Sequence, residues 1–111
     1  MGTFTKGDIV LFPFPYTDLS SRKLRPSLVI SNQMEDDILL CQITSKGIKK
    51  DKYTVELKNN ELLEGDLMID SYVRTNMIFT ASIELILKKL CKVNKSKYDE
   101  IVESINLIII A

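Results

Sequence analysis

Short apolar runs rich in β-branched residues, separated by Gly, Pro, Asn, Asp and Lys, make up most of this sequence. Runs of this kind are typical of strands that fold back on one another in a small antiparallel β domain. Pro13 and Pro15 follow the first run, where they remove backbone donors, and the polar stretch 16–24 is expected to cross the surface as a loop. The expected strands are 8–12, 27–31, 38–45, 53–57, 67–72, 76–80 and 86–92, with a helical turn at 85–90 as the alternative for the last.

The spacing of apolar residues changes near the C-terminus to steps of three and one, which places them on one face of a helix. Ser96 is the expected N-cap, Asp99 and Glu100 lie in the first turn, and Lys97 faces away from the apolar side. The helix is expected to close one side of a barrel, with partner binding as the alternative. Its apolar face consists of Tyr98, Ile101, Val102, Ile105, Ile108 and Ile109.

Length and charge limit the function. A chain of 111 residues, 45% of them hydrophobic, is expected to form a single domain over residues 1–111 with one core. Its 15 basic and 15 acidic residues cancel, so any nucleic acid would have to bind a local basic patch. No apolar run is long enough for a membrane span or a signal peptide, which predicts a cytoplasmic protein.

The chain contains no His, and its two cysteines, Cys41 and Cys91, are far apart in sequence. A zinc site and a Cys–His nucleophile are therefore not expected, and neither is any other metal or cofactor. Cys41 lies in an apolar run and is expected to be a buried thiol. An enzyme with this composition would have to work with Arg, Lys, Tyr, carboxylates or hydroxyls.

One basic segment comes just before an apolar strand. Arg25 and Pro26 open that strand, so Arg25 is expected at the entrance of a rigid element, with Arg22 and Lys23 on its flexible side. A guanidinium held in this way can bind a phosphate through two parallel hydrogen bonds. The alternative is a solvated basic turn.

Two further segments carry polar groups at strand ends. Thr44 and Ser45 end an apolar strand and are followed by Lys46 in a Lys-rich turn, where hydroxyls and cations could hold a phosphate. Arg74 stands between two expected strands. Thr is also a common strand residue and Ser a common turn residue, so neither segment alone indicates a site.

Taken together and in this order, these segments resemble the MazF/PemK family of toxins from toxin–antitoxin modules. The resemblance covers essentially the whole chain. It implies an SH3-like small β-barrel of about seven strands with a C-terminal helix, the fold shared by MazF and CcdB. The residues that carry it are Gly7-Asp8-Ile9-Val10 with Pro13-Phe14-Pro15, Leu24-Arg25-Pro26-Ser27-Leu28-Val29-Ile30-Ser31, Cys41-Gln42-Ile43-Thr44-Ser45-Lys46 and Ser71-Tyr72-Val73-Arg74.

The resemblance also implies an activity. Family members are usually homodimers that cut single-stranded RNA without a metal, through attack of a 2′-hydroxyl on the neighbouring phosphate, and a cognate antitoxin inhibits them. By position, Arg25 and Thr44 match the family's catalytic arginine and hydroxyl residue, and Arg74 matches a basic position near the same cleft. The remaining candidates for RNA contact are Arg22, Lys23, Ser45 and Lys46.

Two positions depart from the family pattern. Ser20 stands where some members carry an acidic residue, which leaves Asp18 as the nearest carboxylate and the general base unassigned. Cys91 stands where glycine is common. Two other functions stay open: a CcdB-like gyrase poison, which would use the apolar end Ile108–Ile110, and a barrel that binds RNA or protein without catalysis.

Overall fold

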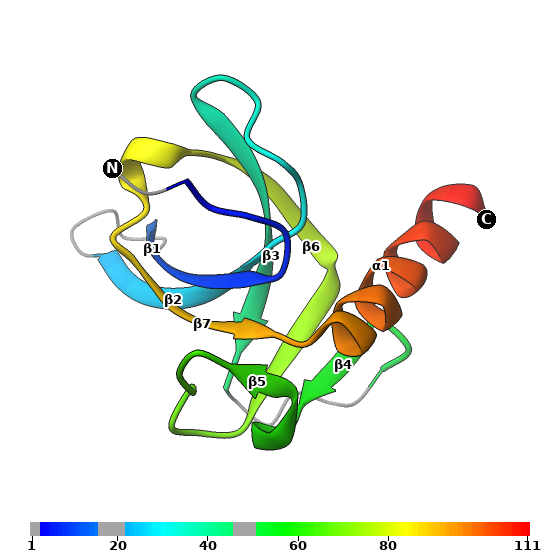
Figure 1. The fold of residues 1–111 in the computed structure, drawn as a ribbon. Helices are drawn as coiled ribbons and strands as arrows, with labels where there is room; N and C mark the ends of the chain where they lie inside the picture. Colours follow the sequence, from blue (N-terminus) through cyan, green and yellow to red (C-terminus); the bar gives the residue numbers. More distant parts are fainter. Residues whose placement is uncertain (1–2, 16–21, 46–50) are drawn as a thin grey trace.

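A single curved antiparallel sheet forms most of the molecule. The structure, a computed structural model, describes residues 3–15, 22–45 and 51–111. Seven strands follow the order β4-β6-β3-β2-β1-β7-β5, and the sheet curls into a nearly closed barrel with α1 beside it (Figure 1). This confirms the predicted fold class. The elements are β1 (Asp8–Pro15), β2 (Arg22–Val29), β3 (Asp37–Thr44), β4 (Thr54–Leu57), β5 (Leu62–Leu63), β6 (Ser71–Ser82), β7 (Lys88–Val93) and α1 (Lys95–Ile110), with 3-10 turns η1 (Asn59–Glu61) and η2 (Ile83–Leu85).

The first two strands are longer at one end than predicted. β1 continues through Pro13 to Pro15, and β2 already begins at Arg22, which pairs with Pro15. The predicted loop is therefore wrong for residues 22–24, whereas 16–21 lie outside the described residues. β1 pairs with β7 only as far as Leu11, so beyond that point it has one neighbouring strand, and proline at alternate positions is tolerated there.

The two strands predicted at 67–72 and 76–80 are a single strand, β6, and residues 67–70 are not part of it. β6 is 12 residues long, and its pairing with β3 shifts register in the middle: Cys41 is opposite Ile78, but Ile43 is opposite Val73. The extra residues bend β6 instead of ending it. The polar residues that suggested a turn lie in this bend. The two-residue strand β5 was not predicted, and the helical alternative at 85–90 is wrong, because β7 begins at Lys88.

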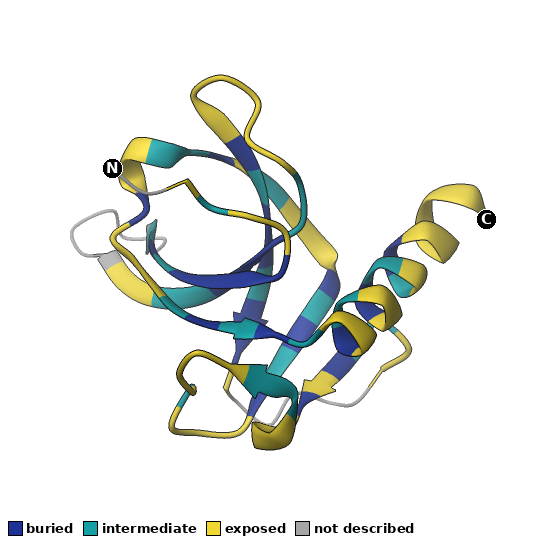
Figure 2. Cartoon of the chain, viewed as in Figure 1, coloured by how far each residue is buried: buried dark blue, intermediate teal, exposed yellow. Residues whose placement is uncertain are grey.

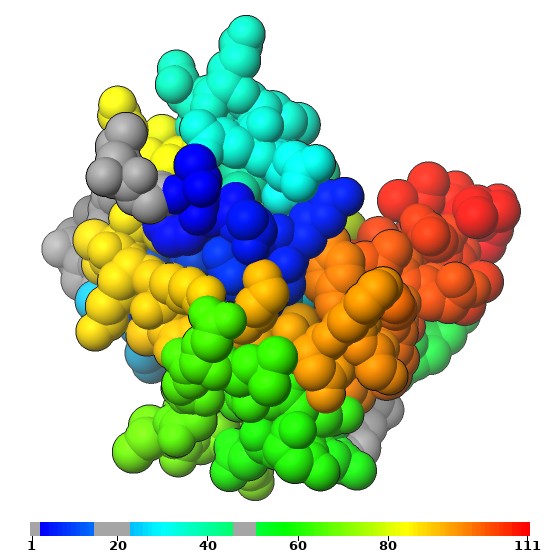
Figure 3. All heavy atoms as spheres, in the orientation of Figure 1, coloured from blue at the N-terminus to red at the C-terminus, as the bar shows by residue number. Residues whose placement is uncertain are grey.

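The predicted C-terminal helix is confirmed, but its details differ. The N-cap is Asn94, whose side-chain oxygen accepts a hydrogen bond from the Lys97 backbone N–H at 2.7 Å, so the assignment of Ser96 was wrong. Ile101 and Ile105 are buried, as their spacing predicted, whereas Ile109 is 72% exposed. Figures 2 and 3 show why: the last turns of α1 project beyond the body of the molecule. Among the described residues, no helix is long and apolar enough to cross a membrane.

Buried apolar side chains cover both faces of the central strands, in two clusters. Cys41 and Cys91 are both fully buried, which confirms the reading of Cys41 as a buried thiol. Burial raises the pKa of Cys41 to about 12. The cluster that includes α1 contains Ile9, Leu28, Cys41, Ile43, Val55, Leu57, Val73, Cys91, Val93, Ile101 and Ile105. The other contains Val10, Phe12, Val29, Ile38, Leu40, Ala81 and Ile86.

Candidate active site

Arg25 and Thr44 lie on neighbouring strands at matching positions. β2 and β3 pair with Ser27 opposite Gln42 at the end of their ladder, and Arg25 and Thr44 each lie two residues beyond this last pair. Cross-strand partners project from the same face of a sheet. Arg25 stands inside β2, opposite Phe12 of β1, and not at the strand entrance that the sequence suggested. The fold therefore brings the two predicted catalytic residues together on one face.

We call this surface the Arg25–Thr44 face and define it by Lys23, Arg25, Thr44, Tyr72 and Arg74. Tyr72 belongs to it because it is the cross-strand partner of Thr44, and Lys23 and Arg74 lie two residues along their strands from Arg25 and Tyr72. Thr44 is 5% exposed, Arg25 is half-buried and Lys23 is exposed. Because a strand holds its backbone rigid, Arg25 is fixed where a guanidinium could bind two oxygens of one phosphate beside the Thr44 hydroxyl.

Arg74 contributes charge at the far side of this face. It pairs with Thr54 of β4, and its backbone carbonyl accepts a hydrogen bond from the Cys41 thiol at 3.0 Å. Its Nε atom is buried and has no hydrogen-bond partner among the described residues. The pKa of Asp51 is lowered, first by hydrogen bonds from the Tyr53 backbone N–H and the Thr54 hydroxyl and then by the nearby charge of Arg74. Arg74 thus lies in a polar corner beside β4 and is not a freely solvated cation.

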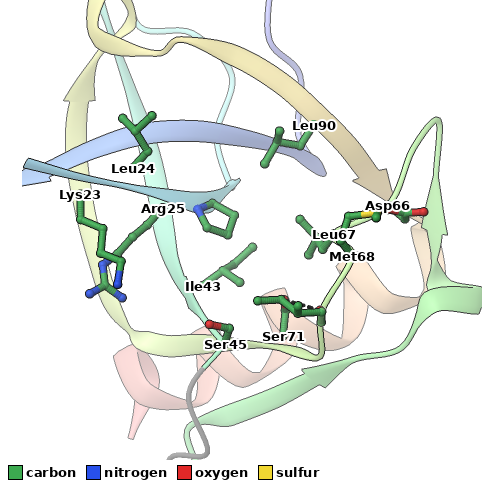
Figure 4. A pocket seen from close by; sticks show the side chains of 12 residues that line it. Lys23, Leu24, Arg25, Ile43, Ser45, Asp66, Leu67, Met68, Ser71 and Leu90 are labelled. Carbon is green, nitrogen blue, oxygen red and sulfur yellow. Dashed lines mark hydrogen bonds between the residues drawn. The ribbon is translucent and has the colours of Figure 1, made fainter.

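A pocket of about 450 Å³ opens at the edge of the same strands. In Figure 4 the Lys23 and Arg25 side chains extend in one direction from β2, whereas Ile43, Leu67 and Leu90 line the space beside it. Ser45 lines this pocket too. The sequence did not predict this pocket. Its lining residues are Lys23, Leu24, Arg25, Pro26, Ile43, Ser45, Asp66, Leu67, Met68, Ile69, Ser71 and Leu90.

The wall formed by residues 66–69 depends on an irregular backbone. Glu64 and Met68 adopt positive φ angles of 59° and 66°, and Gly65 has φ 141°. A Cβ atom on Gly65 would lie 2.3 Å from the Leu90 carbonyl oxygen, so only glycine lets this loop approach β7 so closely. Gly65 next to Asp66 is a turn signal in the sequence, but the apolar run 67–69 that follows it predicts a strand.

The other predicted site residues are placed as follows. Arg22 belongs to β2, so the expectation that Arg22 and Lys23 lie in a flexible segment is wrong. Lys46, Asp18 and Ser20 lie outside the described residues. In the part of the chain that the structure describes, no three His, Cys, Asp or Glu side chains group together as metal ligands.

Comparisons with known proteins agree with this architecture. The structure resembles a MazE–MazF complex from Deinococcus radiodurans (TM-score 0.81, 15% identity, 98% of this chain and 97% of the other). It also resembles a mycobacterial endoribonuclease solved with its cognate antitoxin (TM-score 0.76, 15% identity, 96% and 94%) and another mycobacterial endoribonuclease (TM-score 0.73, 17% identity, 98% and 93%). These likenesses concern the fold.

The amino-acid sequence adds a family assignment. Comparison with curated proteins gives no significant match. The profile of the family described as PemK-like, MazF-like toxins of type II toxin–antitoxin systems matches residues 5–109, which is nearly the whole chain. The chain therefore belongs to the PemK-like, MazF-like toxin family of type II toxin–antitoxin systems.

Proposed function

We propose that this protein is an endoribonuclease toxin that cleaves single-stranded RNA without a metal ion, inhibits translation and is controlled by a cognate antitoxin. The observation that carries the proposal is that Arg25 and Thr44 lie at the same end of the β2–β3 ladder, each two residues beyond the Ser27–Gln42 pair, in a chain of this toxin family. Solved proteins of the same fold are endoribonucleases, and one of them was solved with its antitoxin. The cytoplasm, where translated RNA is found, is the proposed location.

In the proposed reaction, the ribose 2′-oxygen attacks the adjacent phosphorus and the bond from phosphorus to the 5′-oxygen breaks. The products are a 2′,3′-cyclic phosphate and a 5′-hydroxyl, which requires RNA because DNA lacks the nucleophile. The 2′-hydroxyl loses a proton and the leaving 5′-oxygen gains one. Arg25 stabilises the charge that grows on the non-bridging oxygens, and the Thr44 hydroxyl donates a hydrogen bond to the same group. Lys23 and Arg74 supply local positive charge for neighbouring phosphates, and we propose the same role for Arg22 and Lys46. Ser45 would contribute a hydroxyl hydrogen bond to such a phosphate.

Substitutions at Arg25 and Thr44 test this assignment. Arg25→Lys keeps the charge but loses the planar fork, so the cleavage rate should fall much more than RNA affinity does. Thr44→Val removes one transition-state hydrogen bond, which typically costs about a hundred- to a thousandfold in rate, while Thr44→Ser should retain more activity. Thr80→Val, at an exposed position elsewhere on β6, is the matched control and should leave the rate unchanged.

Rates and product ends are measured on a mixed RNA pool, with affinity measured separately. If Arg25→Lys and Thr44→Val both fold and cut RNA within a few-fold of the unmodified protein, these residues are not catalytic. Growth arrest that persists in both variants without any RNA cleavage would favour a toxin that poisons a protein target.

We also propose that the protein is a homodimer. Leu107, Ile109 and Ile110 at the end of α1 are 61%, 72% and 79% exposed, a concentration of apolar surface that association would cover. Sedimentation should then give about twice the chain mass of 12.7 kDa. A monomer at micromolar concentration would contradict this proposal and leave the cleavage proposal intact.

A further inference from the structure

Tyr72 places an aromatic ring among polar groups on the Arg25–Thr44 face. Its cross-strand partner on β3 is Thr44, and its partner on β4 is the exposed Glu56. Two residues further along β6, on the same face, stands Arg74. The ring therefore lies next to the hydroxyl proposed to hold the reacting phosphate, one strand further from Arg25.

Core packing does not account for this ring. Among the described residues, the half-buried apolar side chains packed on the cluster beside α1 include Tyr98, but neither cluster includes Tyr72. Tyr72 is half-buried, so part of its surface is open to solvent. Its in-register neighbours, Thr44 and Glu56, offer it no apolar partner. A half-open ring in a polar, cationic surface is the arrangement that proteins use to stack an unpaired base.

The spacing expected between cross-strand neighbours puts Tyr72 within reach of a nucleotide held at Thr44. Directly opposed cross-strand residues have Cβ atoms about 4.5–5.5 Å apart, so the Tyr72 ring begins about that far from Thr44. A phosphate bound by Arg25 and Thr44 would leave the base of an adjoining nucleotide free to reach Tyr72. Arg74 and Lys23, on the two sides of this pair, can attract the phosphates before and after it.

We infer that Tyr72 is a stacking platform that holds the base next to the scissile phosphate, and so positions the RNA for cleavage. This inference rests on the proposed function and deepens it. Purines have larger faces than pyrimidines, so Tyr72 should favour a purine at that position. Its contribution is to binding and alignment: it donates no group to the reaction itself.

The test replaces Tyr72 and reads out stacking directly. A cleavage site is first mapped on a random-sequence RNA pool. An oligonucleotide with that site then carries a 2′-O-methyl group on the attacking ribose, which blocks the reaction, and 2-aminopurine on either side of the cut. Stacking on Tyr72 should quench the 2-aminopurine fluorescence at one of these two positions in the unmodified protein.

Tyr72→Leu should abolish that quenching and weaken binding about 5- to 100-fold, the range expected for the loss of one aromatic stack. KM on cleavable RNA should rise by a similar factor while kcat changes much less. Tyr72→Phe should keep the affinity, the quenching and the rate, because the ring remains. Tyr53→Leu is the matched control: Tyr53 precedes β4 and lines a groove with Leu107 and Ile108 of α1, so its loss should leave the quenching unchanged.

Two results would overturn the inference. The first is an absence of quenching at both positions in the unmodified protein, which does not depend on any variant folding. The second is a Tyr72→Leu protein with a normal melting curve that binds and quenches like the original. If cleavage requires Arg25 and yet Tyr72→Leu is unaffected, only the role of Tyr72 is wrong. If the unmodified protein cuts no RNA at all, the proposed function fails and the inference fails with it.

Discussion

Lys97 is the clearest test of what fixes α1 to the sheet. Its side chain, only 9% exposed, forms ion pairs of 3.1 Å with Glu61 and 3.0 Å with Glu100. Glu61 belongs to η1, just before β5, so this lysine joins the first turn of the helix to the edge of the barrel. The sequence predicted that Lys97 faces away from the apolar side of the helix, which is wrong, because Lys97 is buried together with Ile101 and Ile105. We expect Lys97→Met, which keeps the apolar stem and removes the charge, to lower the stability of the protein.

The size of the stability loss in Lys97→Met depends on how exposed the two glutamates that pair with Lys97 are. Removing one member of a fully buried ion pair costs about 3–5 kcal/mol. Glu61 and Glu100 are 21% and 57% exposed, so water can solvate the two carboxylates that Lys97→Met leaves without a partner. Ion pairs that are exposed on the surface contribute only about 0.2–1 kcal/mol. An intermediate loss of about 2 kcal/mol is expected. At an unfolding entropy near 2.1 cal/mol/K per residue, this lowers the Tm by roughly 9 °C.

The pH dependence gives a second signature. Burial by itself would lower the pKa of Lys97, but hydrogen bonds to Glu100 and Glu61 outweigh it, and the pKa is raised. Burial would raise the pKa of Glu61, but hydrogen bonds from the Lys58 backbone N–H and from Lys97 lower it. The stabilisation is therefore complete between the ordinary values of 4.5 for Glu and 10.5 for Lys, and declines beyond either limit. The Tm difference between the two proteins should shrink as the pH falls below 4.5.

Calorimetry or far-UV circular dichroism at several pH values measures both effects. Lys95→Met is the matched control, because Lys95 pairs with Asp99 at 2.9 Å but is 87% exposed. It should change the Tm by no more than about 2 °C. If Lys97→Met and Lys95→Met give the same Tm near neutral pH, the Lys97 ion pairs do not stabilise the docking of α1.

Three further predictions use other parts of the structure. Gly65→Ala should lower the free energy of unfolding by about 1–3 kcal/mol, measured as a lower urea midpoint, because its Cβ would lie 2.3 Å from the Leu90 carbonyl oxygen at φ 141°; an unchanged midpoint would contradict this close approach. Burial raises the pKa of Cys41 to about 12 and that of Cys91 to about 11, so neither thiol should react with a disulfide reagent at pH 8 until urea unfolds the protein. Rapid reaction of the native protein would refute the burial of these thiols. Excess chelator should leave the cleavage of an unstructured RNA oligonucleotide nearly unchanged, whereas loss of activity that magnesium restores would contradict the proposed mechanism.

Periodicity predicted the parts of the fold in which one face is buried. The three-and-one spacing located Ile101 and Ile105 on the buried side of α1, because a helix must place such residues on a single face. The same spacing continues to Ile109, yet that residue is exposed, because the sheet ends before the helix does. A local pattern carries no information about the extent of the surface that it packs against.

The candidate site was only partly predictable, for a different reason. Arg25 and Thr44 were selected by family resemblance, since a basic residue and a hydroxyl at strand ends are ordinary in any β protein. Their register depends on strand pairing, which no single segment encodes. The sequence near Arg74 predicts a turn instead of the bend that β6 makes there, because polar residues are common both in turns and in bent strands. Leu67 and Met68 belong to a short apolar run of the kind that strands use, although Gly65 and its neighbours hold them in a loop.

The ladder between β1 and β7 has a consequence for biosynthesis. It pairs Ile9 with Cys91, and Asp8 with Lys92, so residues far apart in the sequence form one ladder inside the sheet. Contacts so distant in sequence form late in folding, because a long loop must first be ordered. During translation β1 has no partner on this side until the ribosome has released β7. A prematurely terminated chain that lacks β7 would expose one edge of β1 and would be a substrate for proteolysis before it could be a toxin.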